Sequence, residues 1–155
     1  MISVRKMQAV DVEAVSQIEA AVFSQPWSVQ GFLDALSLEN TIFLVAEENK
    51  KILGYVGMYV SLDEGEITNV AVTPEARRRG VGQSLIEKIK KEAEANSVLQ
   101  MILEVRVSND PAIRLYQRNG FLNCGIRKGF YDFPKEDAYI MIYRKDVELL
   151  TKDFH

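Results

Sequence analysis

The first half of the chain alternates between helical and extended patterns of apolar residues. Between residues 11 and 23 the apolar side chains recur every three or four positions, which predicts one amphipathic helix carrying Val12, Val15, Ile18 and Val22. A second helix is expected after Pro26, because Ser28 can cap a segment whose apolar residues are Phe32, Leu33 and Leu36. Segments 41–47 and 52–62 are rich in β-branched and aromatic residues and flank a polar turn, which predicts a hairpin, and residues 66–72 predict a third strand.

The second half predicts alternating helices and strands. A helix with one buried face extends to about Ala95, since Val81, Leu85, Ile89 and Ala93 repeat every four residues. In a strand at 99–107, Met101, Leu103 and Val105 share one face while Ile102, Glu104 and Arg106 share the other. A short helix is expected next, with Asp110 as N-cap, Pro111 at its first position and a stop at Asn119-Gly120. Segments 121–127 and 137–145 complete an α+β or mixed α/β sheet with helices on both faces.

Composition narrows the class of protein. A chain of 155 residues, 47% hydrophobic and without a linker, suits one domain over 1–155. With 19 basic against 22 acidic residues, the charge does not indicate a nucleic-acid partner. No run approaches the roughly 18 apolar residues of a membrane span, and residues 1–15 contain no apolar signal core, so we expect a cytoplasmic protein that does not bind membranes.

Cysteine and histidine content limits the possible chemistry. Cys124 is the single cysteine and His155 the single histidine, so the sequence predicts neither a disulfide, nor a metal site, nor a catalytic nucleophile paired with histidine. We expect Cys124 to be a small buried hydrophobe, Trp27 to belong to the core and His155 to be a disordered end.

The segment VTPEARRRGVGQSL at 72–85 predicts an anion site. A strand ending at Val72, followed by a glycine-bearing turn and a helix, presents free backbone N–H groups and the positive end of a helix dipole. Gly80 and Gly82 permit close approach, and the arginines at 77–79 add positive charge, which would suit a pyrophosphate. The third glycine of a dinucleotide fingerprint is absent, since Leu85 occupies its place, and so is the Gly-Lys-Ser/Thr of a P-loop. The alternative is that this turn is a solvated loop without a binding role.

The surroundings of this turn resemble a known family. Arg77-x-x-Gly80-x-Gly82, followed by LEVRVSNDPAIRLYQRNGF at 103–121, is similar to the acetyl-CoA-binding core of the GNAT N-acetyltransferases, and within them to the ribosomal-protein-alanine N-acetyltransferases. The similarity covers most of the chain, including PWS at 26–28, EITNVAV at 66–72, IRKGFY at 126–131 and EDAYIM at 136–141. Lys128-Gly129-Phe130 departs from the more usual Arg-Asn-Tyr in the loop on the substrate side.

The resemblance implies a fold, a cosubstrate and a reaction. The fold would be a mostly antiparallel twisted sheet with one splayed parallel pair of strands. Acetyl would pass directly from acetyl-CoA to the α-amine of a protein N-terminus, the alanine of a small-subunit ribosomal protein, with no metal and by a monomer or weak homodimer. The resemblance places the backbone of Val70, Ala71 and Val72 along the pantetheine arm. It assigns the remaining cofactor contacts to Arg77, Arg78, Arg79, Gly80, Val81, Gly82, Gln83, Ser84 and Asn109.

The resemblance also implies catalytic and substrate-binding roles. Glu104 corresponds to the general base and Tyr116 to the acid that protonates the departing thiolate, while the substrate side would hold Glu66, Asn69, Tyr131 and Asp137. Each has a structural alternative: Glu104 as a solvent-facing strand residue, Tyr116 as a core tyrosine, and the others as turn, strand-end or loop residues. Two alternatives remain for the protein as a whole, namely acetylation of lysine side chains or small amines, and an acetyl-CoA-binding module without transfer.

Overall fold

The structure is a computed structural model, and it describes residues 1–145. The strands are β1 (Ser3–Lys6), β2 (Thr41–Glu48), β3 (Lys51–Ser61), β4 (Glu64–Val72), β5 (Gln100–Arg106), β6 (Leu122–Asp132) and β7 (Lys135–Arg144). The helices are α1 (Val12–Val22), α2 (Val29–Leu36), α3 (Val81–Ala95) and α4 (Asp110–Arg118), with 3₁₀ turns η1 (Ala9–Asp11) and η2 (Pro74–Ala76). Among the described residues, no helix combines the length and apolar character needed to cross a membrane.

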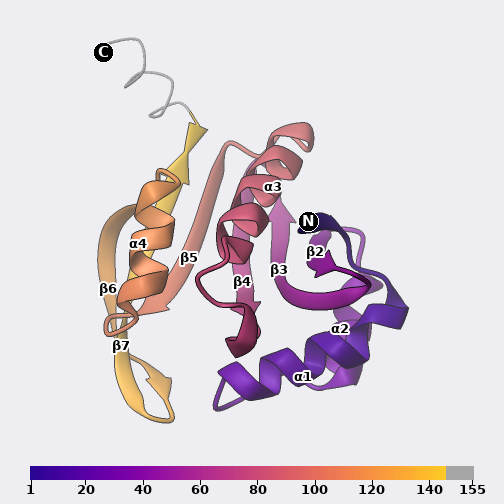
Figure 1. The fold of residues 1–155 in the computed structure, drawn as a ribbon. Helices are drawn as coiled ribbons and strands as arrows, with labels where there is room; N and C mark the ends of the chain where they lie inside the picture. Colours follow the sequence, from indigo (N-terminus) through magenta and orange to yellow (C-terminus); the bar gives the residue numbers. More distant parts are fainter. Residues whose placement is uncertain (146–155) are drawn as a thin grey trace.

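All seven described strands belong to one sheet with the order β1-β2-β3-β4-β5-β7-β6 (Figure 1). Neighbouring strands are antiparallel except β4 and β5, which are parallel and connected through α3. The parallel pairing covers only three positions, from Glu64 with Gln100 to Glu66 with Ile102. Beyond these pairs β4 and β5 separate, so the sheet has an open gap at its centre. The mixed sheet with one splayed parallel pair is confirmed.

Helices cover both faces of the sheet, as predicted. On one face α3 and α4 pack over a core that includes Leu85, Ile89, Leu103, Phe121 and Met141. On the other face α1 and α2 cover β2, β3 and β4 with a second cluster that includes Val15, Phe32 and Tyr55. Trp27 is half-buried and packs beside this second cluster, with ring centroids 5.3 Å from Phe32.

Local signals in the sequence position most elements. The Ser28 hydroxyl oxygen accepts the Gly31 N–H at 3.0 Å, so the predicted cap of α2 is confirmed. Helix α3 ends at Ala95, the 41–62 hairpin forms as β2 and β3, and Met101, Leu103 and Val105 are buried along one face of β5. The last two strands extend further than predicted, toward Asp132 in β6 and from Lys135 in β7, because their pairing continues past the apolar runs.

Three expectations are wrong. β1 was not predicted: it is a four-residue edge strand without an apolar run, and it forms because β2 offers a partner. The N-cap of α4 is Asn109 rather than Asp110, since the Asn109 side chain accepts the Ala112 N–H at 3.3 Å. Cys124 is exposed rather than buried, because it lies at a register shift of the edge strand β6. His155 lies outside the described residues.

Candidate active site

The gap between β4 and β5 exposes strand backbone. Thr73 N–H donates to Leu53 O at 2.8 Å, and β4 stays in register with β3 from Asn69 to Val72. Because backbone groups alternate between the two edges of a strand, the N–H and C=O groups of Val70 and Val72 are directed away from β3, toward the gap, while those of Ala71 are directed to β3. The edge of β4 therefore offers hydrogen-bonding groups to an extended chain of a ligand.

The turn after β4 and the first residues of α3, residues 77–83, form a candidate anion site that we call the cradle. Arg78 and Gly80 adopt left-handed conformations with φ of 65° and 80°, and the helix begins at Val81. The N–H groups of residues 81–83 have no acceptor within the helix, whereas Ser84 N–H donates to Gly80 O at 3.0 Å. A Cβ built on Gly80 would meet no atom within 4 Å, so the turn faces open space. Free amides, a helix N-terminus and open space together fit a phosphate group.

The side chains around the cradle differ in whether they are free to contact a bound anion. Arg77 and Arg78 are exposed, whereas Arg79 forms an ion pair with Glu48 at 2.6 Å that holds the pKa of this carboxyl below its usual range. The amide of Gln83 exchanges two hydrogen bonds with the buried amide of Asn119, at 3.1 and 2.9 Å. Gln83 thus has its backbone N–H, rather than its side chain, available for an anion.

Asn119 does more than end α4, the only role that the sequence analysis gave it. Its pairing with Gln83 joins the first turn of α3 to the C-terminal end of the helix that carries Tyr116. The partly buried Asn-Gln pair therefore connects the cradle to the helix that carries one of the two predicted catalytic residues.

Glu104 lies on β5 two residues beyond the last pair with β4, at the point where the strands separate. Its side chain is 13% exposed and forms an ion pair with the Arg127 guanidinium, with Nε to Oε1 at 3.4 Å. Burial raises the pKa of Glu104, the charge of Arg127 lowers it, and Glu66, at the last β4 position paired with β5, raises it. A carboxylate with a raised pKa at a strand opening has the character of a general base.

Tyr116 is placed by α4 on the other side of β5. It belongs to the core cluster that contains Leu103, whereas Glu104 points to the opposite face of the strand, so the two side chains lie on opposite faces of the sheet. Burial raises the pKa of Tyr116 above its ordinary value, and Tyr131 raises it further. Like any phenol, Tyr116 is protonated at neutral pH and therefore has a proton to donate.

The predicted substrate-side residues fall into two groups. Glu66 is exposed, and its negative charge adds to burial in raising the pKa of Glu104. Tyr131 is half-buried, with the Arg106 guanidinium 4.2 Å from the centre of its ring, and burial and the charge of Glu104 raise its pKa. Two other side chains are engaged within the fold. Asn69 is buried and donates to Glu19 at 3.5 Å, and Asp137 accepts the Gly129 N–H at 2.8 Å between β6 and β7. Asn109, predicted to contact the cofactor, caps α4.

Glu19 is a buried acidic residue that the sequence analysis missed. Its side chain is 2% exposed and accepts hydrogen bonds from the Trp27 N–H at 2.9 Å, the Tyr55 hydroxyl and the Asn69 amide. Burial raises its pKa. Its position four residues after Val15, on the apolar face of α1, was an available signal. Glu19 holds the α1–α2 connection against β3 and β4.

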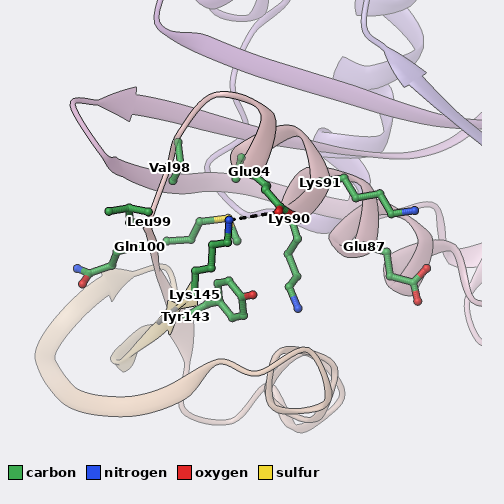
Figure 2. Close-up of a pocket in the computed structure, with 11 residues that line it drawn as sticks. Glu87, Lys90, Lys91, Glu94, Val98, Leu99, Gln100, Tyr143 and Lys145 are labelled. Carbon is green, nitrogen blue, oxygen red and sulfur yellow. Dashed lines mark hydrogen bonds and ion pairs between the residues drawn. The ribbon is translucent and has the colours of Figure 1, made fainter. Parts of the chain in front are cut away.

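A cavity of about 520 Å³ lies away from these residues, at the C-terminal end of α3 (Figure 2). In Figure 2, Lys145 reaches Glu94 at 3.2 Å, and the Lys90 ammonium lies 4.3 Å from the centre of the Tyr143 ring. None of the lining residues belongs to the glycine turn or to the predicted catalytic set. The gap and the cradle, rather than this cavity, define the candidate site.

The fold and the site together are typical of one class of protein: a mixed sheet that opens between two parallel strands, with a candidate anion site after one strand and a partly buried carboxylate on the other. A sequence profile described as the Acetyltransferase (GNAT) family matches residues 12–121. The chain belongs to the GNAT acetyltransferase family.

Similar proteins share most of their length with this chain. The ribosomal protein bS18-alanine N-acetyltransferase of Escherichia coli (strain K12) is 34% identical over 91% of this chain and 96% of its own length. The crystal structure of the ribosomal-protein-S18-alanine N-acetyltransferase from Escherichia coli superposes with a TM-score of 0.85 at 33% identity, covering 93% of this chain and 94% of that chain. A protein of Bacillus subtilis (strain 168) that carries the same name provisionally is 38% identical over 90% of this chain and 93% of its own length. The fold also matches Arabidopsis thaliana NAA60, solved with acetyl-CoA, at a TM-score of 0.83, 22% identity, and coverage of 93% and 99%.

Proposed function

We propose that this protein transfers the acetyl group of acetyl-CoA to the α-amine of a protein N-terminus, specifically the alanine that begins ribosomal protein bS18. The observation that carries the proposal is the position of Glu104 on β5 just beyond its last pair with β4, with Tyr116 of α4 in the core on the opposite face of the sheet. The names of two relatives whose similarity covers 90% and 91% of this chain give the same acceptor.

The residues of the gap fit acetyl-CoA. The cosubstrate supplies an activated acetyl thioester. The amides of residues 81–83, aided by Arg77 and Arg78, would hold the pyrophosphate, and the free backbone groups of Val70 and Val72 would pair with the amides of the pantetheine arm. Gly80 leaves the approach open.

Glu104 and Tyr116 would divide the proton transfers of the reaction. The attacking amine must lose a proton, and the ionised Glu104 carboxylate would accept it, directly or through a water molecule. The departing thiolate must gain a proton, and Tyr116 would donate it, because a phenol is protonated at neutral pH. Two side chains on opposite faces of the sheet would thus carry the two proton transfers, without a covalent enzyme intermediate.

The difference in acceptor basicity favours an N-terminal amine. An α-amine of pKa about 8 costs about 1 kcal/mol to deprotonate at pH 7, whereas a lysine of pKa about 10.4 costs about 4.6 kcal/mol. A single partly buried carboxylate suits the smaller cost.

The test compares two peptides that differ only at the α-amine. Both carry the N-terminal sequence of bS18 and an internal lysine, and one has its α-amine blocked; mass spectrometry locates the acetyl group after incubation with acetyl-CoA. We expect acetylation at the free alanine and none of the blocked peptide. Comparable acetylation of the blocked peptide would instead identify a lysine acetyltransferase. Binding of acetyl-CoA without transfer to either peptide would identify a non-catalytic module.

A further inference from the structure

Arg127 reaches Glu104 from two strands away. Between β5 and β6 lies β7, and the register places Arg127 opposite Ala138, which in turn pairs with Arg106. Strands lie about 4.8 Å apart, so a residue on β6 must span about 10 Å to reach β5. Glu104 itself lies opposite Ile140, two residues further along β7, so the long Arg127 side chain crosses β7 diagonally to reach it.

Two contacts hold the guanidinium in place. Its Nε lies 3.4 Å from Oε1 of Glu104, and its centre lies 5.8 Å from the centre of the Phe130 ring on the same strand. The Arg127 side chain is 54% exposed, whereas that of Glu104 is 13% exposed. The ion pair therefore joins a solvent-facing cation to a carboxylate that is largely withdrawn from water.

The other charged groups around Glu104 do not duplicate this contact. Glu66 faces it from β4 and carries the same charge, and Tyr131 approaches from β6. Arg106, on the same strand and face as Glu104, is engaged by Glu136 of β7 at 3.2 Å and by the Tyr131 ring. Among the described residues, the cation that forms an ion pair with Glu104 is Arg127.

We propose that Arg127 is a positioning residue that keeps the Glu104 carboxylate ionised and oriented for proton transfer. Without the guanidinium, burial and the negative charge of Glu66 would be opposed only by the hydrogen bond from the Glu104 backbone, and the carboxylate would take up a proton at higher pH. The base would then be lost over part of the range in which the wild-type protein works. This inference rests on the proposed function, because it gives Arg127 a task in the same reaction.

The first test measures Glu104 itself and requires no acetyl transfer. The full chain is labelled with ¹³C-glutamate, its carboxyl resonances are titrated by NMR, and Glu104→Gln assigns the signal. An exposed ion pair contributes up to about 1 kcal/mol, which corresponds to a change in pKa of up to about 0.7. We therefore expect Arg127→Met to raise the pKa of Glu104 by about half a unit. Arg127→Lys, which retains the charge, should restore most of the wild-type value.

The matched control is Arg144→Met. Arg144 lies at the far end of β7, in the same half of the sheet, and donates to the neutral Gln100 side chain at 2.8 Å. Its removal changes the net charge by the same amount and should leave the Glu104 titration unchanged. An unchanged Glu104 titration in Arg127→Met, or an equal shift in Arg144→Met, would overturn the proposal.

The second test asks whether this charge governs the reaction. With the free-alanine peptide, the acid limb of the pH profile of kcat/KM should move upward in Arg127→Met by the amount seen in the titration, and Arg127→Lys should reverse most of the movement. In the Glu104→Gln background, Arg127→Met should leave the acid limb of the pH profile unchanged. An acid limb that stays in place while the titration shifts would overturn the role in catalysis. Failure of the peptide assay in the wild-type protein would refute the proposed function alone, because the titration is read independently.

Discussion

Glu104→Gln offers the most direct test of the mechanism, because it removes a base while keeping the shape of the side chain. General-base catalysis typically contributes a factor of about 10²–10⁴, or about 3–5 kcal/mol of transition-state stabilisation. The loss should be seen in kcat/KM with the free-alanine peptide, measured by the release of CoA thiol.

The structure also sets the expected cost in stability. The substitution breaks the ion pair with Arg127, whose side chain is 54% exposed, and such pairs contribute about 0.2–1 kcal/mol. It also removes a charge whose burial is unfavourable, as the raised pKa of Glu104 indicates. We therefore expect the free energy of unfolding to change by less than about 1 kcal/mol, which moves Tm by no more than about 4 °C.

The pH dependence separates loss of a base from a general disturbance. The neutral fraction of an α-amine of pKa about 8 rises from about one-tenth at pH 7 to about nine-tenths at pH 9. The activity of the Gln variant relative to wild type should rise by up to about tenfold over this range, because the amine no longer needs the carboxylate. Glu94→Gln, which removes a carboxylate at the far end of α3, is the control. A Glu104→Gln variant with wild-type kcat/KM, or with a relative activity that does not vary with pH, would refute the assignment.

Three further substitutions probe the cradle, the acid and the buried carboxylate. Tyr116→Phe should lower kcat at every pH below the titration of the tyrosine and leave acetyl-CoA affinity, measured by calorimetry, nearly unchanged; an unchanged kcat would show that the phenol is only a core residue. Gly82→Asp should weaken CoA binding far more than the uncharged Gly82→Asn, since both meet Leu115 but only one repels a pyrophosphate; equal losses would indicate a steric effect. For Glu19, whose pKa is raised in the folded state, wild-type stability should fall as pH rises through the window above the ordinary glutamate pKa. In Glu19→Gln the free energy of unfolding, measured by urea denaturation, should not fall over this pH window. If the free energies of unfolding of the wild type and the variant changed equally with pH, the argument from burial would be wrong.

Periodicity was sufficient for elements whose burial repeats within their own length. The four-residue repeat of α3, the alternation of β5 and the serine cap of α2 are local signals, and each was read correctly. β1 carried no such signal, because a short edge strand forms only when a partner strand is present. The cap of α4 was misplaced by one residue, since Asn109 and Asp110 have similar local preferences and the backbone conformation decides between them.

For the candidate site, the sequence alone predicted the glycine turn, and the family resemblance supplied Glu104 and Tyr116. The tertiary structure decided which partners these side chains have. Arg127 meets Glu104 only because β7 pairs with both strands and so places β6 two positions from β5 in the sheet. Gln83 meets Asn119 only because α4 packs beside the start of α3. Glu19 is buried by β3 and β4, which follow it by tens of residues. A side chain's own pattern can indicate that it is buried or exposed, but its pKa depends on charges and surfaces brought from elsewhere in the chain, so only the folded structure determines it.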